Sequence, residues 1–317
     1  MENVQLGNTD LQIKPIFFGG NVFGWTLNEE ESFRILDAFL DRGFNAIDTA
    51  NNYSYWVEGN VGTESERIIG NWLKSRGVRD QVVLATKVGG RNMIQDKANT
   101  TKAHILKEVE DSLLRLQTDY IDLYQTHYDD TETPVEETLS AYSQLIKEGK
   151  VRFIGASNFS SERLIESLEK AKLYNLPAYN TLQPEYNLFD RQHFEEFLQP
   201  VAEKYNLGVI PYYSLASGFL SGKYRSEEDL EKSVRGNGIK KYLNERGFKI
   251  LDALETISNR YTISYSAVSL AWLLDQKTVA APIVSATKES HLDAFVEAVN
   301  VQLSHDDIKL LSEASDY

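Results

Sequence analysis

Leu123-Tyr124-Gln125-Thr126-His127 is the end of a β-like run in which apolar residues alternate with polar ones and the last residue is a histidine. Two earlier runs finish in a similar way. Phe44-Asn45-Ala46-Ile47-Asp48 ends in an aspartate, and Val82-Val83-Leu84-Ala85-Thr86-Lys87 ends in a lysine. If these strands are parallel and adjacent, their carboxyl ends point into one crevice. We therefore expect the three terminal side chains to meet in space.

The runs belong to a longer alternation of predicted strands and helices. Eight strand-then-helix units begin near Ile16, Asn45, Val82, Tyr120, Val151, Asn180, Gly208 and Val279. Such alternation requires parallel strands joined by crossover helices, and eight units close a (β/α)8 barrel. An open doubly wound sheet is the rival fold, but no G-x-G-x-x-G sequence follows the first predicted strand.

A hairpin is expected before the barrel, with strands Val4–Leu6 and Leu11–Lys14. The predicted fold class is therefore α/β, a TIM barrel with an N-terminal β-hairpin and two extra helices. No linker rich in proline, glycine or serine divides the chain, so residues 1–317 are expected to form a single domain. Residues 214–246 are turn-rich and charged, which predicts a functional loop that covers a ligand.

The composition excludes several classes of function. The chain has 317 residues, a formal net charge of −14 and no cysteine. Without a cluster of lysine and arginine, binding to nucleic acid or to an anionic membrane surface is not expected. Disulfides, thiolate nucleophiles and cysteine metal sites are excluded. No apolar run approaches the roughly 18 residues of a membrane span, and residues 1–10 lack the apolar region of a signal peptide. We expect a cytoplasmic protein without a metal, as a monomer or weak homo-oligomer.

The residues at the strand ends suit the reduction of a carbonyl group. A carbonyl oxygen that gains negative charge needs a proton, and the phenol of Tyr53, just beyond Asp48, can give it. An adjacent ammonium favours tyrosinate, so Lys87 is expected to lower the pKa of Tyr53 while Asp48 holds Lys87 in place. His127 can donate a hydrogen bond to the carbonyl oxygen.

Each of these residues also has a plainer interpretation. Asp48 can be a helix or loop cap, and Tyr53 a wall residue. Lys87 can be a surface charge, and His127 a strand-end histidine whose hydrogen bonds are satisfied. It is much less probable that all four residue types fall near the ends of consecutive strands by chance, and this favours the chemical interpretation.

The same stretches resemble the aldo-keto reductase family over nearly the whole chain. Gly43–Tyr53 is similar to the family motif G-x-n-x-x-D-T-A-x-x-Y, and Tyr120–Asp129 to Y-x-D-L-x-x-x-H-x-x-D. Gly149–Phe159 is similar to G-K-V-R-x-x-G-x-S-N, and Gln183–Asn187 follows it. The resemblance implies a catalytic tetrad in which tyrosine is the general acid, formed by Asp48, Tyr53, Lys87 and His127.

The resemblance also implies a nicotinamide cofactor, NADPH with NADH as the alternative. The residues that match the family's nicotinamide site are Ser157, Asn158, Gln183 and Tyr212. The loop Tyr213–Lys223 matches a segment that folds over the cofactor, where small residues let backbone N–H groups approach the pyrophosphate. Its expected cofactor-binding residues are Leu215, Gly218, Leu220 and Lys223. In the plainer interpretation Ser157 and Asn158 start a helix and Gln183 ties strands together.

The adenosine end departs from the family pattern. Where the family usually reads G-x-[R/S]-x-x-x-Q-x-x-E-N, this chain has Ser285–Phe295. Lys288 lies at a predicted helix start and is expected to pair with the 2′-phosphate of NADPH, with Ser285 in the same site. A solvated lysine at a helix end is the alternative.

A second departure is the aromatic insert Ser54–Asn60. An aromatic pocket for the carbonyl substrate is expected from four residues, Trp25, Trp56, Tyr128 and Tyr186. Such a cluster can also be packing. The chain ends soon after its last predicted helix, without the long C-terminal loop of many relatives, so we expect an open site that accepts many carbonyl compounds.

Two other functions remain as alternatives. The chain also resembles the β-subunits of voltage-gated potassium channels, which share the fold and bind the nucleotide, so a nucleotide-binding interaction protein is one of them. In those β-subunits asparagine stands at the position of His127, so the histidine of this chain favours an enzyme. A barrel lyase or isomerase would leave the nicotinamide-site residues unexplained. The sequence therefore predicts an NADP(H)-dependent alcohol dehydrogenase that reduces aldehydes or ketones, sugar-derived ones included, with Tyr53 as general acid.

Overall fold

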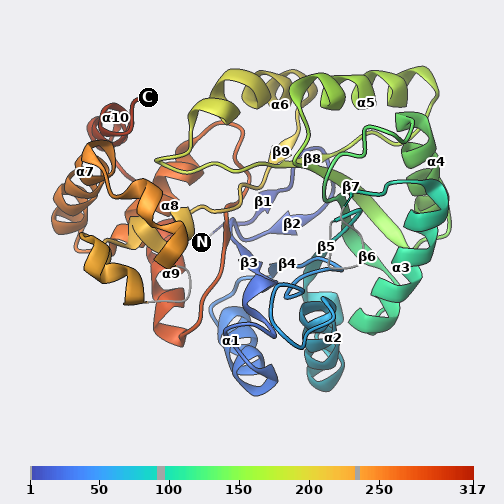
Figure 1. Cartoon of the computed structure of the whole chain (residues 1–317), viewed down its shortest axis with the longest axis horizontal. Helices are drawn as coiled ribbons and strands as arrows, with labels where there is room; N and C mark the ends of the chain where they lie inside the picture. The colour runs from blue at the N-terminus through green and yellow to red at the C-terminus, as the bar shows by residue number, and fades with distance from the viewer. Residues whose placement is uncertain (1, 91–96, 233–235) are drawn as a thin grey trace.

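The computed structural model describes residues 2–90, 97–232 and 236–317. Its centre is a curled sheet of eight parallel strands in the order β10-β3-β4-β5-β6-β7-β8-β9. Figure 1 shows the strands in the middle and the helices around them. The strands are β3 (Phe17–Gly19), β4 (Ala46–Asp48), β5 (Val83–Val88), β6 (Ile121–Thr126), β7 (Val151–Ser157), β8 (Thr181–Gln183), β9 (Gly208–Val209) and β10 (Ile283–Val284). The predicted TIM-barrel class is confirmed.

The hairpin before the barrel is also confirmed. β1 (Val4–Gln5) pairs with β2 (Gln12–Ile13) in antiparallel register. The apolar residues of this hairpin, Leu6, Leu11 and Ile13, are buried and pack with inward-facing strand residues in a second core cluster. The hairpin therefore covers the amino-terminal end of the barrel and leaves the carboxyl ends of the strands for the site.

Ten α-helices lie within the described residues. They are α1 (Glu29–Asp41), α2 (Glu64–Arg76), α3 (Lys102–Leu116), α4 (Val135–Lys147), α5 (Ser161–Leu173), α6 (Gln199–Tyr205), α7 (Glu245–Tyr261), α8 (Tyr265–Asp275), α9 (Asp293–Asn300) and α10 (His305–Ala314). Side-chain caps hold the amino-terminal ends of two of them. Asn28 forms a capping box with Glu31 at the start of α1, and Ser160 accepts a hydrogen bond from the Arg163 amide at the start of α5.

The last strand differs from its prediction. Its unit was expected to begin near Val279, but β10 begins at Ile283. Pro282 has no N–H group, so it interrupts the ladder. Before it, the chain pairs with β9, since the Val209 amide donates to the Thr278 oxygen and the Ala280 amide to the Val209 oxygen, at 3.0 and 2.8 Å. After it, β10 pairs with β3. This change of partner closes the barrel.

The predicted loop 214–246 contains short 3₁₀ helices where it is described. They are η4 (Ala216–Ser221), η5 (Glu227–Lys232), η6 (Gly236–Gly238) and η7 (Lys240–Tyr242). The apolar side chains of Phe219 and Tyr242 stack at 5.2 Å between ring centroids and are buried, which ties both ends of the loop to the core. No helix of the described chain is long and apolar enough to cross a membrane.

Candidate active site

The centre of the site is a buried ion pair between adjacent strands. Lys87 of β5 donates from Nζ to Asp48 Oδ2 of β4 at 2.5 Å, and the two side chains are 0% and 1% exposed. Nζ also donates to the backbone oxygen of Thr49 at 2.9 Å and to the Tyr53 hydroxyl at 2.8 Å. The ammonium therefore has three oxygen partners and no contact with bulk water.

Two glutamines hold the other oxygen of Asp48. Gln125 of β6 and Gln183 of β8 each donate from Nε2 to Asp48 Oδ1 at 3.0 Å. Gln125 lies two residues before His127, so both side chains leave the same side of β6, and in the register Gln125 stands opposite Lys87. The barrel interior thus fixes the carboxylate from two further strands. Sequence reasoning missed Gln125, although an amide inside an apolar run was the available signal.

The environment of Tyr53 raises its pKa instead of lowering it. Burial is the first cause, and the negative charge of Asp48 is the second. The expectation that Lys87 would lower the pKa of Tyr53 is therefore wrong for this structure, because loss of solvation and Asp48 outweigh the ammonium. The phenol keeps its proton at neutral pH, while its oxygen already accepts a hydrogen bond from Lys87.

His127 follows directly after β6 and is neutral at pH 7. Its burial, and then the charge of Lys87, hold the pKa of His127 well below its usual range. The rings of His127 and Tyr53 lie 6.0 Å apart, centroid to centroid. Nδ1 is buried and has no hydrogen-bond partner in the described parts of the chain. A proton there would be an unpaired buried donor, so we assign it to Nε2.

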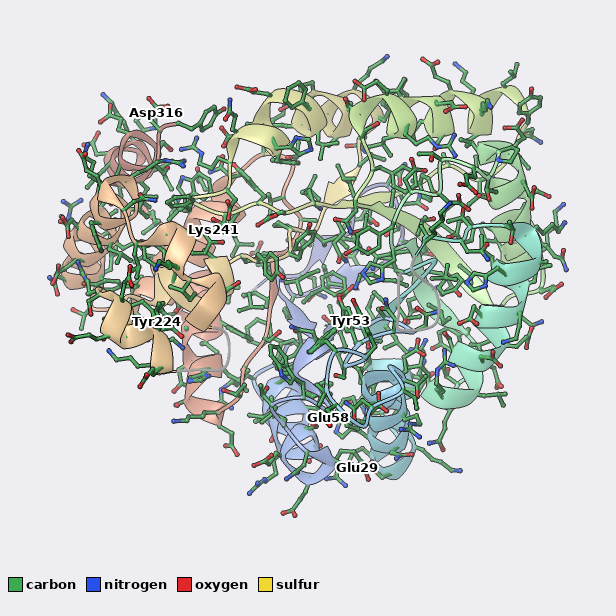
Figure 2. The ribbon with its side chains drawn as sticks, in the orientation of Figure 1. Glu29, Tyr53, Glu58, Tyr224, Lys241 and Asp316 are labelled. Atoms are coloured by element: carbon green, nitrogen blue, oxygen red, sulfur yellow. The ribbon has the colours of Figure 1, made fainter. Side chains whose placement is uncertain are left out.

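A cavity of about 1220 Å³ opens onto these groups. Asp48, Tyr53 and His127 line it at the carboxyl ends of the strands. It continues past the end of β10 to Ser264 at the start of α8 and Glu297 of α9. Figure 2 labels Tyr53 near the middle of the molecule, and Figure 1 places α8 and α9 on one side of it. The cavity is therefore elongated, with the ion pair at one end.

The predicted nicotinamide residues form a hydrogen-bonded chain beside His127. Asn158 donates from Nδ2 to the His127 backbone oxygen at 2.9 Å and to Ser157 Oγ at 3.1 Å. Tyr212 donates from its hydroxyl to Asn158 Oδ1 at 2.9 Å. Ser157, Asn158, Gln183 and Tyr212 all line the cavity. Asn158 has a φ of +55°, a conformation that asparagine tolerates better than most residues, so it turns the chain out of β7.

The loop residues divide into two groups. Leu215, Gly218 and Lys223 line the cavity, as does Ser285 after β10. Leu220 does not. Its side chain is 0% exposed in the apolar core, and its amide donates to the Leu215 oxygen at 3.2 Å.

The two residues expected at the adenosine end of the site, Ser285 and Lys288, lie in different surroundings. The hydroxyl of Ser285 lies 2.7 Å from both the Gly19 backbone oxygen and Asn21 Oδ1, so it has partners within the protein. Lys288 precedes the 3₁₀ helix η8 (Glu289–Leu292) and is exposed, but it is not among the residues that line the cavity wall. His291 lines that wall instead, and sequence reasoning did not select it.

The aromatic residues expected around the substrate are also divided. Trp56 is 43% exposed, lines the cavity and lies edge-on to Tyr53 at 6.1 Å between centroids. Trp25 packs edge-on against Trp56 at 5.7 Å, behind the cavity wall. Tyr128 lines the cavity with its ring 4.8 Å from that of His127.

Tyr186 is not part of this aromatic wall. It is 1% exposed, packs on Phe194 and Trp272, and donates from its hydroxyl to Glu195. Its expected role in the substrate pocket is therefore wrong, because its side chain points into the core. Tyr213, 51% exposed, lines the cavity and was not predicted.

The described chain contains no group of histidine, cysteine and acidic side chains that could hold a metal ion.

Comparison with known proteins places the chain in a family. The model of the aldo/keto reductase family matches residues 15–316. Aldo-keto reductase YhdN of Bacillus subtilis (strain 168) is 36% identical over 98% of this chain and 92% of its own length. The uncharacterized oxidoreductase YrpG of the same organism is 32% identical over 99% and 95%. The putative aryl-alcohol dehydrogenase AAD14 of Saccharomyces cerevisiae is 29% identical over 95% and 83%. The chain therefore belongs to the aldo-keto reductase family of oxidoreductases.

Proposed function

We propose that this protein reduces aldehydes or ketones to alcohols with NADP(H), with Tyr53 as general acid. One observation carries the proposal: the Tyr53 hydroxyl lies 2.8 Å from Lys87 Nζ and, together with His127, lines the same end of the cavity. A phenol that keeps its proton, backed by a buried ammonium, is what a carbonyl oxygen needs when it becomes an alkoxide.

The roles of the four residues follow from their contacts. An alkoxide is a much stronger base than a phenolate, so the proton moves from Tyr53 to the substrate oxygen even though burial raises the pKa of Tyr53. Lys87 stabilises the phenolate that remains. Asp48 keeps Lys87 oriented, and the two glutamines keep Asp48 oriented. His127 donates from Nε2 to the carbonyl oxygen and fixes its position.

The cavity residues fit a nicotinamide dinucleotide. The cofactor supplies the hydride when it is bound. Asn158, Gln183 and Tyr212 stand beside the catalytic group, where an amide and an aromatic face suit a nicotinamide ring. Farther along, Ser217 and Gly218 have positive φ values of 56° and 100° and line the cavity, so the backbone there lies close to any pyrophosphate. Lys223 adds a positive charge on the same wall.

The substrate side of the site favours flat, apolar carbonyl compounds. Trp56, Tyr128 and Tyr213 present ring surface to the cavity next to Tyr53. Rings pack well against other rings, at about 0.5–1.5 kcal/mol beyond the area they bury. Aromatic aldehydes therefore fit this wall better than sugars, whose hydroxyl groups would face ring carbon. The similarity to a putative aryl-alcohol dehydrogenase is consistent with this choice.

The test is the variant Tyr53→Phe, which removes the proton and keeps the ring. Turnover of benzaldehyde with NADPH should fall by about 100-fold or more, the contribution of a general acid. The Kd of NADPH, measured by the quenching of tryptophan fluorescence, should stay within about twofold of the wild-type value, a change of only ~0.4 kcal/mol.

The matched control is Tyr55→Phe. Tyr55 also lines the cavity and packs on Trp56, but no contact between it and Lys87 is found in the described chain. Its turnover should change little. If Tyr53→Phe kept wild-type turnover, the proposed mechanism would be refuted. If neither NADPH nor NADH bound to the protein, the proposed function itself would be refuted.

A further inference from the structure

The aromatic insert Ser54–Asn60 forms a loop that is closed by its own hydrogen bonds. The Val57 amide donates to the Ser54 oxygen at 3.1 Å, and the Asn60 amide donates to the Val57 oxygen at 3.0 Å. The side chain of Asn60 then joins the two ends of the insert, because Nδ2 donates to the Ser54 oxygen at 3.1 Å. The insert therefore has a defined shape of its own.

Two further hydrogen bonds fasten the insert to the segment Phe23–Leu27, which leads from β3 towards α1. The hydroxyl of Ser54 donates to the Phe23 backbone oxygen at 2.7 Å. Nδ2 of Asn60 donates to the Gly24 backbone oxygen at 2.8 Å. Ser54 is 0% exposed and has a φ of +74°, a conformation that serine rarely adopts, so its surroundings hold the backbone there. Both hydrogens of the Asn60 amide group thus have an acceptor, one within the insert and one outside it.

Between these attachment points the insert carries Trp56, whose ring is contacted edge-on by three other rings. The distances between centroids are 6.1 Å to Tyr53, 5.5 Å to Tyr55 and 5.7 Å to Trp25, at interplanar angles between 61° and 88°. Trp25 belongs to the segment that accepts the two hydrogen bonds from the insert. The ring contacts and the hydrogen bonds therefore join the insert and this segment into one unit.

Trp56 is the part of this unit that a substrate can reach. It is 43% exposed and lines the cavity beside Tyr53. Among the described residues, neither Ser54 nor Asn60 lines the cavity wall. In the view of Figure 2, Glu58 of the insert is labelled on the α1 side of Tyr53. A substrate in the cavity therefore contacts Trp56 directly, and Asn60 can affect it only through the position of that ring.

We propose that Asn60 is a positioning residue for substrate selection, which acts through Trp56 and makes the site selective for aromatic over aliphatic aldehydes. The inference rests on the proposed function, because it concerns the substrate of that reaction. The Asn60 amide connects the insert with the segment behind Trp56. The ring thus already stands in the cavity wall before a substrate arrives.

The benefit of this arrangement is that the wall is ordered in advance. Ordering a loop on binding reduces affinity, so a wall that is already in place binds a flat ring more tightly. Without the Asn60 amide, the oxygens of Ser54 and Gly24 each lose a donor, and the insert can adopt other arrangements. The apparent dissociation constant then rises in inverse proportion to the fraction of molecules in which Trp56 stands in place. An aliphatic aldehyde gains little from the ring, so its binding depends much less on that fraction.

The experiment compares benzaldehyde with butanal, at saturating NADPH, in the full chain and in Asn60→Ala. KM for benzaldehyde should rise about fivefold, as expected if Trp56 stands in place in about one fifth of the molecules. Its kcat should stay within about twofold, because the substitution leaves the catalytic residues unchanged. KM for butanal should also stay within about twofold. Loss of folded protein would instead lower the apparent kcat for both aldehydes and leave both KM values unchanged.

A double-mutant cycle tests whether Asn60 acts through Trp56. In the Trp56→Leu background, Asn60→Ala should leave KM for benzaldehyde unchanged, because the ring that Asn60 positions is already absent. Asn60→Gln keeps the donating amide and should keep KM for benzaldehyde close to the wild-type value. Asn300→Ala is the matched control. It removes a bond of 2.8 Å from an exposed asparagine to the Val296 backbone oxygen, outside the cavity wall, and should change neither KM.

Acrylamide quenching of tryptophan fluorescence gives a measure that does not depend on activity. Trp72 and Trp272 are 0% exposed, so the quencher reaches mainly the other two tryptophans, Trp25 and Trp56. Asn60→Ala should raise the quenching constant, because the ring of Trp56 is then in solvent for more of the time. Asn300→Ala should leave the quenching constant unchanged.

The outcomes separate this inference from the proposed function. If the wild type reduces neither aldehyde with NADPH or NADH, the proposed function fails, and the role of Asn60 in substrate selection fails with it. If the wild type is active but Asn60→Ala raises KM for both aldehydes equally, the function stands and the role of Asn60 is refuted. The same holds if Asn60→Ala raises KM for benzaldehyde as much in the Trp56→Leu background. Unchanged KM values together with unchanged quenching in Asn60→Ala would also overturn the inference.

Discussion

The buried pair Asp48–Lys87 can be tested by removing one charge or both. In Lys87→Met a carboxylate that is 1% exposed loses its cation. Breaking one partner of a buried pair costs about 3–5 kcal/mol, because the remaining charge is neither solvated nor neutralised. The double variant Asp48→Asn/Lys87→Met removes that charge as well. We expect the double variant to be more stable than the single one.

The size of the difference follows from the contacts of Asp48. The asparagine oxygen can still accept from Gln125 and Gln183, which donate to Asp48 Oδ1 at 3.0 Å. What remains is the new amide NH2 group in place of Oδ2, and a buried N–H left without a partner costs about 1–3 kcal/mol. Subtracting this from about 3–5 kcal/mol predicts that the second substitution restores ~2 kcal/mol. Both variants should lose turnover, because Tyr53 has lost its ammonium in both.

Urea unfolding followed by tryptophan fluorescence measures these free energies, since the chain has 4 tryptophans. Lys107→Met is the matched control. It breaks the ion pair with Asp111, in which the lysine is 70% exposed, and should leave the midpoint unchanged. A double variant no more stable than Lys87→Met would mean that the buried carboxylate is not the source of the loss, and the reasoning would be refuted.

Three further predictions concern His127 and its surroundings. Burial, and then Lys87, hold the pKa of His127 well below its usual range, so the unfolded chain binds this proton more readily. The free energy of unfolding should reach its full value above about pH 6.5 and fall by up to about 1.4 kcal/mol per pH unit below it. Urea unfolding of the wild type and of His127→Gln, which lacks this titrating group, measures the effect. Parallel plots of unfolding free energy against pH for the two proteins would contradict the prediction. In Gly90→Ala the new Cβ would lie 2.7 Å from His127 Nδ1 and 2.5 Å from Asn52 Nδ2. Because these contacts are too close, His127 must shift, and kcat/KM should fall by up to about 100-fold. In the control Gly238→Ala the new Cβ has nothing within 4 Å, so kcat/KM should not change. Trp56→Leu should raise KM for benzaldehyde by up to about tenfold and leave that for butanal nearly unchanged, and equal effects on both would argue against an aromatic substrate wall.

The strand ends were predictable because periodicity and parallel pairing are local rules. Asp48, Lys87 and His127 each close a short apolar run, and strict alternation leaves the carboxyl ends of such runs at one face. The same rule places Gln125 on the side of His127, two residues earlier. Sequence reasoning missed Gln125 because its side chain does not ionise. Its importance comes from its hydrogen bond to Asp48, which is distant in sequence.

Other features depend on three-dimensional packing that no pattern contains. Tyr186 comes three residues after Gln183 and Leu220 directly before Ser221, and both Gln183 and Ser221 line the cavity, yet the side chains of Tyr186 and Leu220 turn into the core. The pKa of Tyr53 depends on the depth of its burial, which outweighs the lysine beside it. The shift of the last strand follows from Pro282, which was visible in the sequence. His291 lines the cavity wall, although no pattern in the sequence singled it out.

The closure of the barrel has a consequence for the synthesis of the chain. The seam that joins β9 to β3 is made by residues 278–284, about 260 positions after β3 itself. Until that segment leaves the ribosome, the outer edges of β3 and β9 have no partner, although Tyr53, Lys87 and His127 have already been synthesised. Unpaired strand edges invite association with other chains. A chain interrupted before residue 278 would therefore lack the seam and would expose the edges of both strands to other chains.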